Sequence, residues 1–457
     1  MQDFWGSGDC NGRWLDPMKK DDQWTRRNYP DDHNLFLESA EDQIKMIRNF
    51  PSLAVWCGGN EITLPQDIMI PLRDSILPKL DGTRWFVDYS NSDDMSFNSI
   101  GGNGDGPYRI QNLKTFFGYQ TWPFNSEIGS VGVGDLQSLE RFLPKENRIA
   151  PIFDPETKKE TVDSVWRFHK YIGYEEHIAK YGKVKDLNDF GKKAQLVNYD
   201  QYRSLMEGFS AHMWEWYTGV IIWKTQNPWT ALRGQMYDYY LDPNACLYGL
   251  NQGGEPLHIM YNHADSTIML TNNTFKHAYD LMLVMNTYDK EGNQKSLGQV
   301  FVEIGPSTTR TIMGINKQIK EMATKEGVFL SLRLQNLQKE IVSDNLYWLA
   351  DSSGNYSGLT KMEQAKMDIQ AKYLTKNKVL VTLTNPKTNT IAFFNRLSLV
   401  NPKTEKRILP VFYDNNYVSV LPGETKTVEM EFTAEQNVSP KVSLEGWNVT
   451  ETFVPIQ

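Results

Sequence analysis

The character of the sequence changes once, near residue 258, and that change narrows the folds that the chain can adopt. Before it, short apolar runs such as Leu53–Trp56 and Gly219–Trp223 alternate with helical patterns such as residues 187–214. This alternation is typical of a parallel α/β arrangement. From His263 onward, apolar and polar residues alternate in short segments between turns, which is typical of antiparallel β-sandwiches. The chain is therefore predicted to combine an α/β domain with all-β domains.

Turn signals and one polar stretch divide the chain into three predicted domains. The 457 residues suffice for about two to four domains. Residues 351–356 are predicted to be a linker between two strand-rich blocks. We expect an α/β domain at residues 1–258 and β-sandwiches at 259–352 and 357–457. The strands expected in the sandwiches are residues 266–271, 278–288, 300–304, 328–334, 345–349, 378–383, 392–399, 417–420 and 425–432.

Residues 52–61, Ser-Leu-Ala-Val-Trp-Cys-Gly-Gly-Asn-Glu, are predicted to end a buried strand in a turn. The apolar run fits a strand enclosed on both faces, and two glycines let the backbone turn sharply because they lack a Cβ. Asn60 and Glu61 then lie at the carboxyl end of the strand, where barrels of parallel strands and helices keep their catalytic residues. A carboxylate held there is a candidate for proton transfer or nucleophilic attack. The same Asn-Glu pair also suits an ordinary turn, so the interpretation depends on a second carboxylate.

Glu127 is the second carboxylate of similar construction. It follows an aromatic stretch at residues 116–124 and precedes Gly129. Two carboxylates suit glycosidic bond cleavage, because one protonates the leaving oxygen while the other attacks the anomeric carbon or activates water. Nearby aromatic rings can stack on the apolar face of a sugar. The alternative is that Glu127 is a surface carboxylate that happens to follow a core segment.

A third segment, residues 218–235, is predicted to contribute sugar-binding residues. Its apolar strand ends at Trp223, and a polar loop with Gln226, Asn227 and Trp229 follows. Trp223 can form the floor of a sugar subsite or simply cap the core of the domain. Asn227 and Trp229 can line the mouth of the site or satisfy the loop backbone.

Composition excludes several functional classes. The net charge of −8 and the lack of a long basic block disfavour nucleic-acid binding, which needs clustered Lys and Arg. No apolar run is long enough to span a membrane, and the first residues do not read as a secretory signal. The three cysteines, Cys10, Cys57 and Cys246, show no metal-ligand spacing, and Cys57 suits a small core position. No metal or other cofactor is predicted.

Together these segments resemble the C-terminal half of glycoside hydrolase family 2, which includes β-galactosidases, β-mannosidases, exo-β-glucosaminidases and plant endo-β-mannosidases. The likeness covers nearly the whole chain and is greatest to the plant endo-β-mannosidases. Its motifs are Asn49–Glu61, Phe124–Gly129, Lys193–Tyr199, Tyr217–Lys224, Gln226–Thr230, Arg233–Gln235, Glu255–His258, Asn345–Trp348, Leu421–Glu424 and Glu445–Asn448.

The resemblance implies an incomplete (β/α)8 TIM barrel at residues 1–258, followed by two immunoglobulin-like sandwiches. It implies a retaining mechanism with Glu127 as nucleophile and Glu61 as acid and then base, their carboxyl groups about 5–5.5 Å apart. Asn60 would bind the hydroxyl next to the anomeric centre. The substrate implied is a β-mannoside within an oligosaccharide or glycan. The Asn60-Glu61 pair departs from the Ser-Asp of exo-β-glucosaminidases, which argues against an amino sugar.

The resemblance also implies that the first barrel strands and the N-terminal sandwiches of the family are absent, since Met1–Trp5 resembles the tail of the third strand. We therefore expect little or no activity from the isolated chain, and the missing N-terminal half is an expected partner. Any secretory signal would lie in that half, which leaves a periplasmic or secreted location open. Exo-β-glucosaminidase or β-galactosidase specificity, and a non-catalytic carbohydrate-binding or assembly fragment, remain the alternatives.

Overall fold

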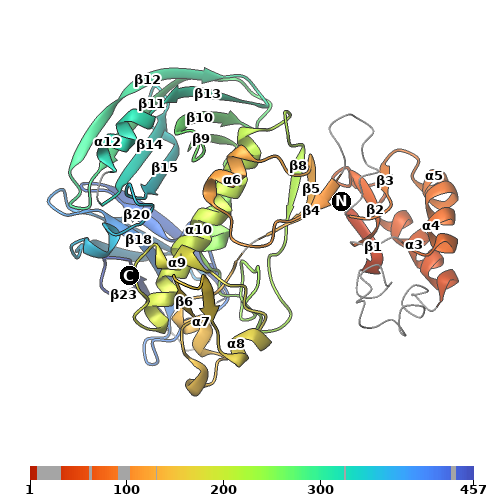
Figure 1. Cartoon of the computed structure of the whole chain (residues 1–457), viewed down its shortest axis with the longest axis horizontal. Coiled ribbons are helices and arrows are strands. Elements are labelled where there is room, and N and C mark those ends of the chain that lie inside the picture. Colours follow the sequence, from red (N-terminus) through yellow and green to blue (C-terminus); the bar gives the residue numbers. More distant parts are fainter. Residues whose placement is uncertain (8–31, 61–63, 91–102, 130, 324–325, 434–438) are drawn as a thin grey trace. The chain divides into compact units, whose positions relative to one another are not determined.

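The computed structural model describes residues 1–7, 32–60, 64–90, 103–129, 131–323, 326–433 and 439–457. They form two compact units, each assembled from three segments of the chain (Figure 1). Unit 1 contains residues 1–107, 121–128 and 215–222, and unit 2 contains residues 108–120, 129–214 and 223–457.

The first sheet of unit 1 is parallel and carries its helices on one side (Figure 1). Helix α3 begins where the Asp32 carboxylate accepts a hydrogen bond from the Leu35 amide, and it buries Phe36, Ala40 and Ile44 against the strands. The elements are β1 (Gln2–Ser7), α3 (His33–Ile47), β2 (Val55–Asn60), α4 (Gln66–Pro71), a π-helical turn (Leu72–Ile76), α5 (Leu77–Leu80) and β3 (Trp85–Val87).

The strand expected at Leu53–Trp56 is displaced toward the carboxyl end in the structure. Strand β2 extends to Asn60, so Gly58 and Gly59 lie inside the strand rather than in the predicted turn. A Cβ on Gly58 would lie 2.3 Å from the carbonyl oxygen of Asp88. The glycine is therefore required because a neighbouring backbone approaches closely, and the turn interpretation of this pair was wrong.

The second sheet of unit 1 is also parallel and has the order β4-β5-β8. Its strands are β4 (Asn103–Asp105), β5 (Phe124–Ile128) and β8 (Gly219–Ile222). Parallel pairing agrees with the expected α/β character of the first block. Because the described strands form two separate three-stranded sheets, the incomplete barrel stays a prediction.

Unit 2 is organised around the long helix α10 (Leu187–Ala211), most of whose residues are buried. The Asp186 carboxylate caps its start by accepting from the Asp189 amide at 2.8 Å. The other elements before the sandwiches are α6 (Leu113–Gly118), α7 (Leu136–Glu140), a 3-10 turn (Lys145–Asn147), β6 (Ile152–Asp154), β7 (Lys159–Thr161), α8 (Ser164–Phe168), α9 (Glu176–Ala179) and α11 (Ala245–Gly253).

The strands expected after residue 258 are present and form β-rich modules of antiparallel sheets (Figure 1). The first pairs the sheet β13-β10-β9 with the sheet β12-β11-β14-β15, and the second pairs β16-β17-β21-β19 with β20-β18-β22-β23. The first contains β9 (Leu257–Tyr261), β10 (Thr267–Asn272), β11 (Ala278–Tyr288), β12 (Gln294–Ile304), β13 (Thr308–Gly314), α12 (Asn316–Met322), β14 (Val328–Gln335) and β15 (Ile341–Leu349). The second contains a 3-10 turn (Leu359–Lys361), β16 (Asp368–Thr375), β17 (Lys378–Thr384), β18 (Ala392–Val400), β19 (Val411–Tyr413), β20 (Val418–Val420), β21 (Thr425–Phe432), β22 (Lys441–Glu445) and β23 (Thr452–Pro455).

One hydrophobic core is shared by the helices of unit 2 and both sandwiches. It includes Tyr199 of α10, Trp348 of β15 and Phe393 of β18, all buried. The segment predicted to be a linker takes part in this packing, because Tyr356 stacks on Tyr181 with ring centroids 4.4 Å apart. Residues 351–356 are therefore a packed connection.

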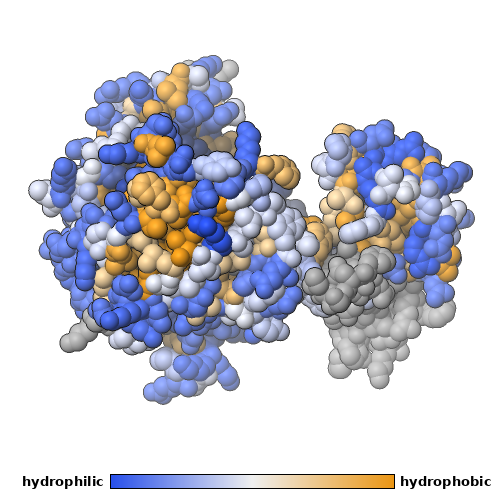
Figure 2. Space-filling view, turned by 90° about the horizontal axis from the view of Figure 1, so that it is seen from above, coloured by the Kyte–Doolittle hydropathy of each residue, from blue (hydrophilic) through white to orange (hydrophobic). Residues whose placement is uncertain are grey.

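Among the described residues, no helix combines the length and apolarity needed to cross a membrane. Cys57 and Cys246 are buried and unpaired, and Cys10 lies outside the described residues. Figure 2 shows a mainly hydrophilic surface with one area of unit 2 where apolar residues gather.

Candidate active site

Glu127 is half-buried on β5, and its backbone is fixed on both sides. Its amide donates to the Oδ1 atom of Asn125 at 3.2 Å, and its carbonyl accepts from the Gly106 amide at 2.7 Å. The Asn125 side chain is fully buried and donates in turn to the Gly106 carbonyl at 2.8 Å. A rigid strand therefore presents this carboxylate, as a catalytic group requires.

Ser90 joins the strand end that carries Glu127 to the strand end that carries Asn60. The Ser90 amide donates to the Gly59 carbonyl at 3.0 Å, and the Ser126 hydroxyl donates to the Ser90 carbonyl. Ser90 and Ser126 are both buried. The residues directly before Asn60 and Glu127 are therefore connected through one residue, which brings two of the predicted site segments together within unit 1.

Asn60 is half-buried at the last position of β2, where it pairs with Ser7 of the parallel strand β1. Glu61 follows it in the chain and lies outside the described residues. The predicted separation of the two carboxyl groups thus stays a prediction, while the strand that leads into Glu61 is in place.

Trp223 directly follows β8 and is surrounded by an aromatic ring and two cations. The Tyr108 ring meets it edge-on at 5.6 Å, while the Lys224 ammonium and the Arg233 guanidinium lie 4.5 and 4.6 Å from its centroid. Its carbonyl oxygen approaches Gly129 so closely that a Cβ there would lie 1.6 Å away. Glycine is therefore required at position 129 because the backbone of Trp223 approaches it closely.

Asn227 is buried and organises the loop after Trp223. Its Oδ1 atom accepts from the Lys224 ammonium at 2.6 Å, and its Nδ2 atom donates to Gln235 at 3.1 Å. Gln235 is buried as well and donates to the carbonyl of Ala231. With these side-chain partners, Asn227 holds the loop in shape, and its contact with a sugar stays a prediction.

Trp229 is half-buried and packs on residues that the sequence interpretation did not include. It stacks on His169 at 5.6 Å and meets the ring of Phe168 edge-on at 5.8 Å. The His169 Nδ1 atom lies 2.6 Å from the Thr230 carbonyl, and Phe168 is 70% exposed. The sequence gives no sign that Phe168, at the end of α8, is exposed, so it could not be predicted as a neighbour of Trp229.

The predicted site residues fall into two groups, each described within its own unit. Asn60 and Glu127 belong to unit 1, and Trp223, Asn227 and Trp229 belong to unit 2. Ser90, Asn125 and Arg233 are additional residues of these groups. Asn125 and Arg233 lie inside the motifs Phe124–Gly129 and Arg233–Gln235, whereas no motif in the sequence marks Ser90. Within the described ranges, no cluster of His, Cys, Asp or Glu is arranged to hold a metal ion.

Comparisons with known proteins place this chain among glycosidases. A domain model described as the exo-β-D-glucosaminidase Ig-fold domain matches residues 345–449. A mannosylglycoprotein endo-β-mannosidase of Lilium longiflorum is 32% identical over 98% of this chain and 57% of its own length. An exo-β-D-glucosaminidase of Arthroderma benhamiae is 26% identical over 94% of this chain and 51% of its own. The chain thus spans about half the length of the relatives that it matches.

Solved structures agree with the fold. An exo-chitosanase of Amycolatopsis orientalis superimposes with a TM-score of 0.77 at 23% identity, covering 93% of this chain and 54% of that enzyme. A β-D-mannosidase of Dictyoglomus thermophilum gives a TM-score of 0.65 at 17% identity, with 93% and 52% covered. The predicted immunoglobulin-like module and the expected resemblance are confirmed. The chain is a homologue of the endo-β-mannosidases and exo-β-D-glucosaminidases of glycoside hydrolase family 2.

Proposed function

We propose that the protein to which this chain belongs is a retaining β-glycoside hydrolase that acts on β-mannosides. The observation that carries the proposal is that Ser90 is hydrogen-bonded both to Gly59, which precedes Asn60, and to Ser126, which precedes Glu127. It supports a pair of carboxylates close enough for double displacement. The scaffold that we propose for these strands is an incomplete (β/α)8 barrel.

In the proposed mechanism, Glu127 attacks the anomeric carbon while Glu61 gives its proton to the departing oxygen. The result is a covalent ester between Glu127 and the sugar. Glu61, now a carboxylate, takes a proton from water, and that water displaces Glu127 at the anomeric carbon with a second inversion. Asn60 binds the hydroxyl beside the anomeric centre, and Trp223 packs against the sugar ring.

The substrate assignment rests on the relatives. One relative, 32% identical to this chain, is named a mannosylglycoprotein endo-β-mannosidase, which supports a β-mannoside within a glycoprotein glycan. The second candidate is an exo-β-D-glucosaminidase, favoured by the domain match over residues 345–449. Because the chain spans about half of each relative, we expect it to be weakly active or inactive on its own.

The test compares aryl β-mannoside with aryl β-glucosaminide, using the longest form of the protein that proves active. Replacing Glu127→Gln should abolish turnover without lowering the melting temperature. Replacing Glu61→Ala should slow hydrolysis by about 10²–10⁴-fold but leave covalent glycosylation by substrates with good leaving groups. Glu321→Gln, at an exposed position of α12, is the matched control. Normal turnover by both active-site variants would refute the catalytic assignment. Faster cleavage of the β-glucosaminide than of the β-mannoside would replace the proposed β-mannoside specificity by a β-glucosaminide specificity.

A further inference from the structure

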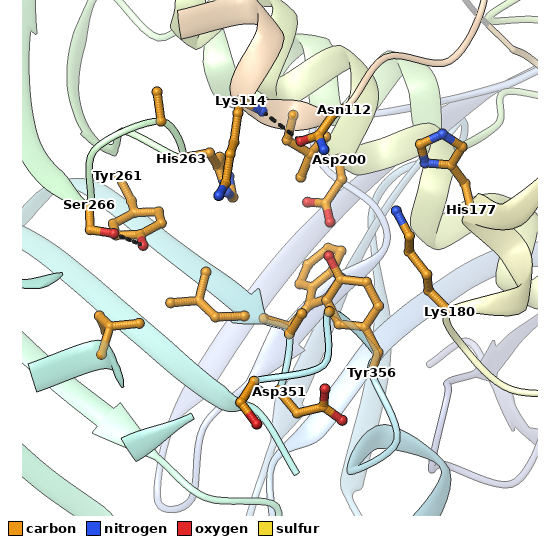
Figure 3. Close-up of a pocket in the computed structure, with 18 of the residues that line it drawn as sticks. Asn112, Lys114, His177, Lys180, Asp200, Tyr261, His263, Ser266, Asp351 and Tyr356 are labelled. Atoms are coloured by element: carbon orange, nitrogen blue, oxygen red, sulfur yellow. Dashed lines mark hydrogen bonds between the residues drawn. The ribbon is translucent and has the colours of Figure 1, made fainter. Parts of the chain in front are cut away.

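A cavity of about 570 Å³ lies in unit 2, and Trp223, Asn227 and Trp229 are not among its lining residues. It is enclosed by α6, by the segment from α9 to α10, by the β9–β10 turn, by α12 and by residues 348–356 (Figure 3). Its volume falls within the range of about 300–1,000 Å³ that small-molecule sites occupy. The family comparison and the proposed reaction leave this cavity without a role.

Positive charge with few local partners is the distinctive property of the cavity. Lys114, Lys180 and Lys320 all line it, and Figure 3 shows Lys114 and Lys180 among the side chains around the open space. The Lys180 ammonium has Glu176 at 3.7 Å. Lys114 and Lys320 form no ion pair with any residue in the described part of the chain. The ammonium groups can therefore accept an additional anionic partner.

The carboxylates of the cavity wall, in contrast, already have partners. Asp200 accepts from the Arg203 guanidinium at 2.7 Å. Asp351 accepts from the hydroxyls of Ser353 at 2.6 Å and Ser357 at 2.9 Å. Their charge is used inside the protein, so the groups left to interact with a ligand are mainly donors.

Two histidines in the wall point to the same conclusion. Burial, followed by the charges of Arg203 and Lys114, lowers the pKa of His263 to about 3. Burial and the charge of Lys180 lower the pKa of His177 to about 4, against the opposing effect of Glu176. The Nε2 atom of His263 is buried without a hydrogen-bond partner in the described structure. Such an atom is costly unless a ligand or water satisfies it.

We propose that this cavity binds an anionic saccharide, a sugar that bears a carboxylate or phosphate group, with Lys114 and Lys180 holding the anionic group. A bare anion would leave most of the volume unfilled. The ring of Tyr356 lines the cavity and is held rigid by stacking on Tyr181, so it offers a firm apolar surface to the sugar ring. Charge-assisted hydrogen bonds from the lysines would supply the affinity.

Calorimetric titration of the full chain with glucuronate, glucose 6-phosphate, glucose and inorganic phosphate tests this site. We expect at least one of the two anionic sugars, glucuronate or glucose 6-phosphate, to bind. The one that binds more tightly identifies the preferred anionic group. Its affinity should fall as ionic strength rises. Glucose and inorganic phosphate should bind far more weakly than that sugar. The Lys114→Gln/Lys180→Gln double variant should lose about tenfold or more in affinity. Lys372→Gln, at an exposed position of β16, should leave it unchanged.

Histidine NMR provides a second readout that does not depend on how well the double variant folds. In the unaltered chain, an anionic sugar should raise the pKa of His177 and His263, because it offsets the lysine charges, whereas glucose should not. Failure of both anionic sugars to bind would overturn the proposal. Equal affinity for glucose or inorganic phosphate, or full affinity in a folded double variant, would overturn it as well.

Discussion

His258 lies buried between two glutamates at the start of the first sandwich. Its Nε2 atom is 3.1 Å from Glu207 of α10, and its Nδ1 atom is 3.0 Å from Glu255. The Tyr347 hydroxyl also donates to Glu207, at 2.6 Å. Burial by itself would lower the pKa of His258, but the two glutamates outweigh it and raise the pKa to about 9. The imidazolium is therefore part of the folded structure at neutral pH.

This environment predicts how stability depends on pH. The unfolded histidine has a pKa near 6.5, so its contribution to stability is complete below that value and is lost as pH rises through about 9. The melting temperature should therefore decrease as the pH rises from about 6.5 to about 9. His258→Gln should flatten this part of the profile, measured by differential scanning calorimetry. His277→Gln, at an exposed position, serves as control, and an unchanged profile in His258→Gln would contradict the assignment.

Single residues also show where sequence interpretation reaches its limit. Glu127, Trp223 and the strand leading to Asn60 could be found because aromatic and apolar runs precede them. Ser90 and the role of Asn125 could not be found, because they depend on contacts with Gly59 and Gly106, distant in sequence, that only the folded chain creates.

At the scale of elements, buried ion pairs tie helix starts to the last sandwich. Asp135, which caps α7, binds Arg396 of β18 and binds Arg407 at 2.8 Å. Asp242 binds Arg396 at 2.6 Å and Arg407 at 3.0 Å. Each carboxylate thus pairs with both arginines, and Asp242 also pairs with Arg141 at 3.1 Å. The loss of one carboxylate leaves buried positive charge uncompensated.

We expect Asp242→Asn to lower the free energy of unfolding by about 3–5 kcal/mol, because it leaves two buried arginines short of charge. Glu429→Gln, which removes the partner of Lys378 in a half-exposed pair, should cost less than about 1 kcal/mol. Urea-induced unfolding of both variants measures the difference. Equal effects would show that the buried network does not stabilise the junction.

The first and last residues of a strand could be predicted where its hydrophobic pattern covers the same residues as its backbone hydrogen bonding. Strands β11 and β21 begin and end at the expected residues, 278–288 and 425–432. Strand β12 begins at Gln294 rather than Val300, because residues 294–299 pair with β11 although they are polar and mainly exposed. Pairing of this kind depends on backbone groups and leaves no hydrophobic periodicity in the sequence.

At the scale of the whole molecule, the shared core predicts that the sandwiches depend on the helices. Residues 259–457 produced alone would expose the side of Trp348 and Phe394 that packs on Tyr199 of α10. We expect this piece to melt at a lower temperature than the full chain and to bind a hydrophobic dye. Dye fluorescence and calorimetry test this, and an undiminished melting temperature would show that the sandwiches are independent.

The two units interleave along the chain, which passes between them at residues 107–108, 120–121, 128–129, 214–215 and 222–223. A single genetic crossover therefore cannot exchange one unit for a relative's version of it. A crossover at residues 107–108, for example, would combine β4 from one parent with β5 and β8 from the other. Chimaeras with related proteins should therefore be designed from matched sets of all three segments.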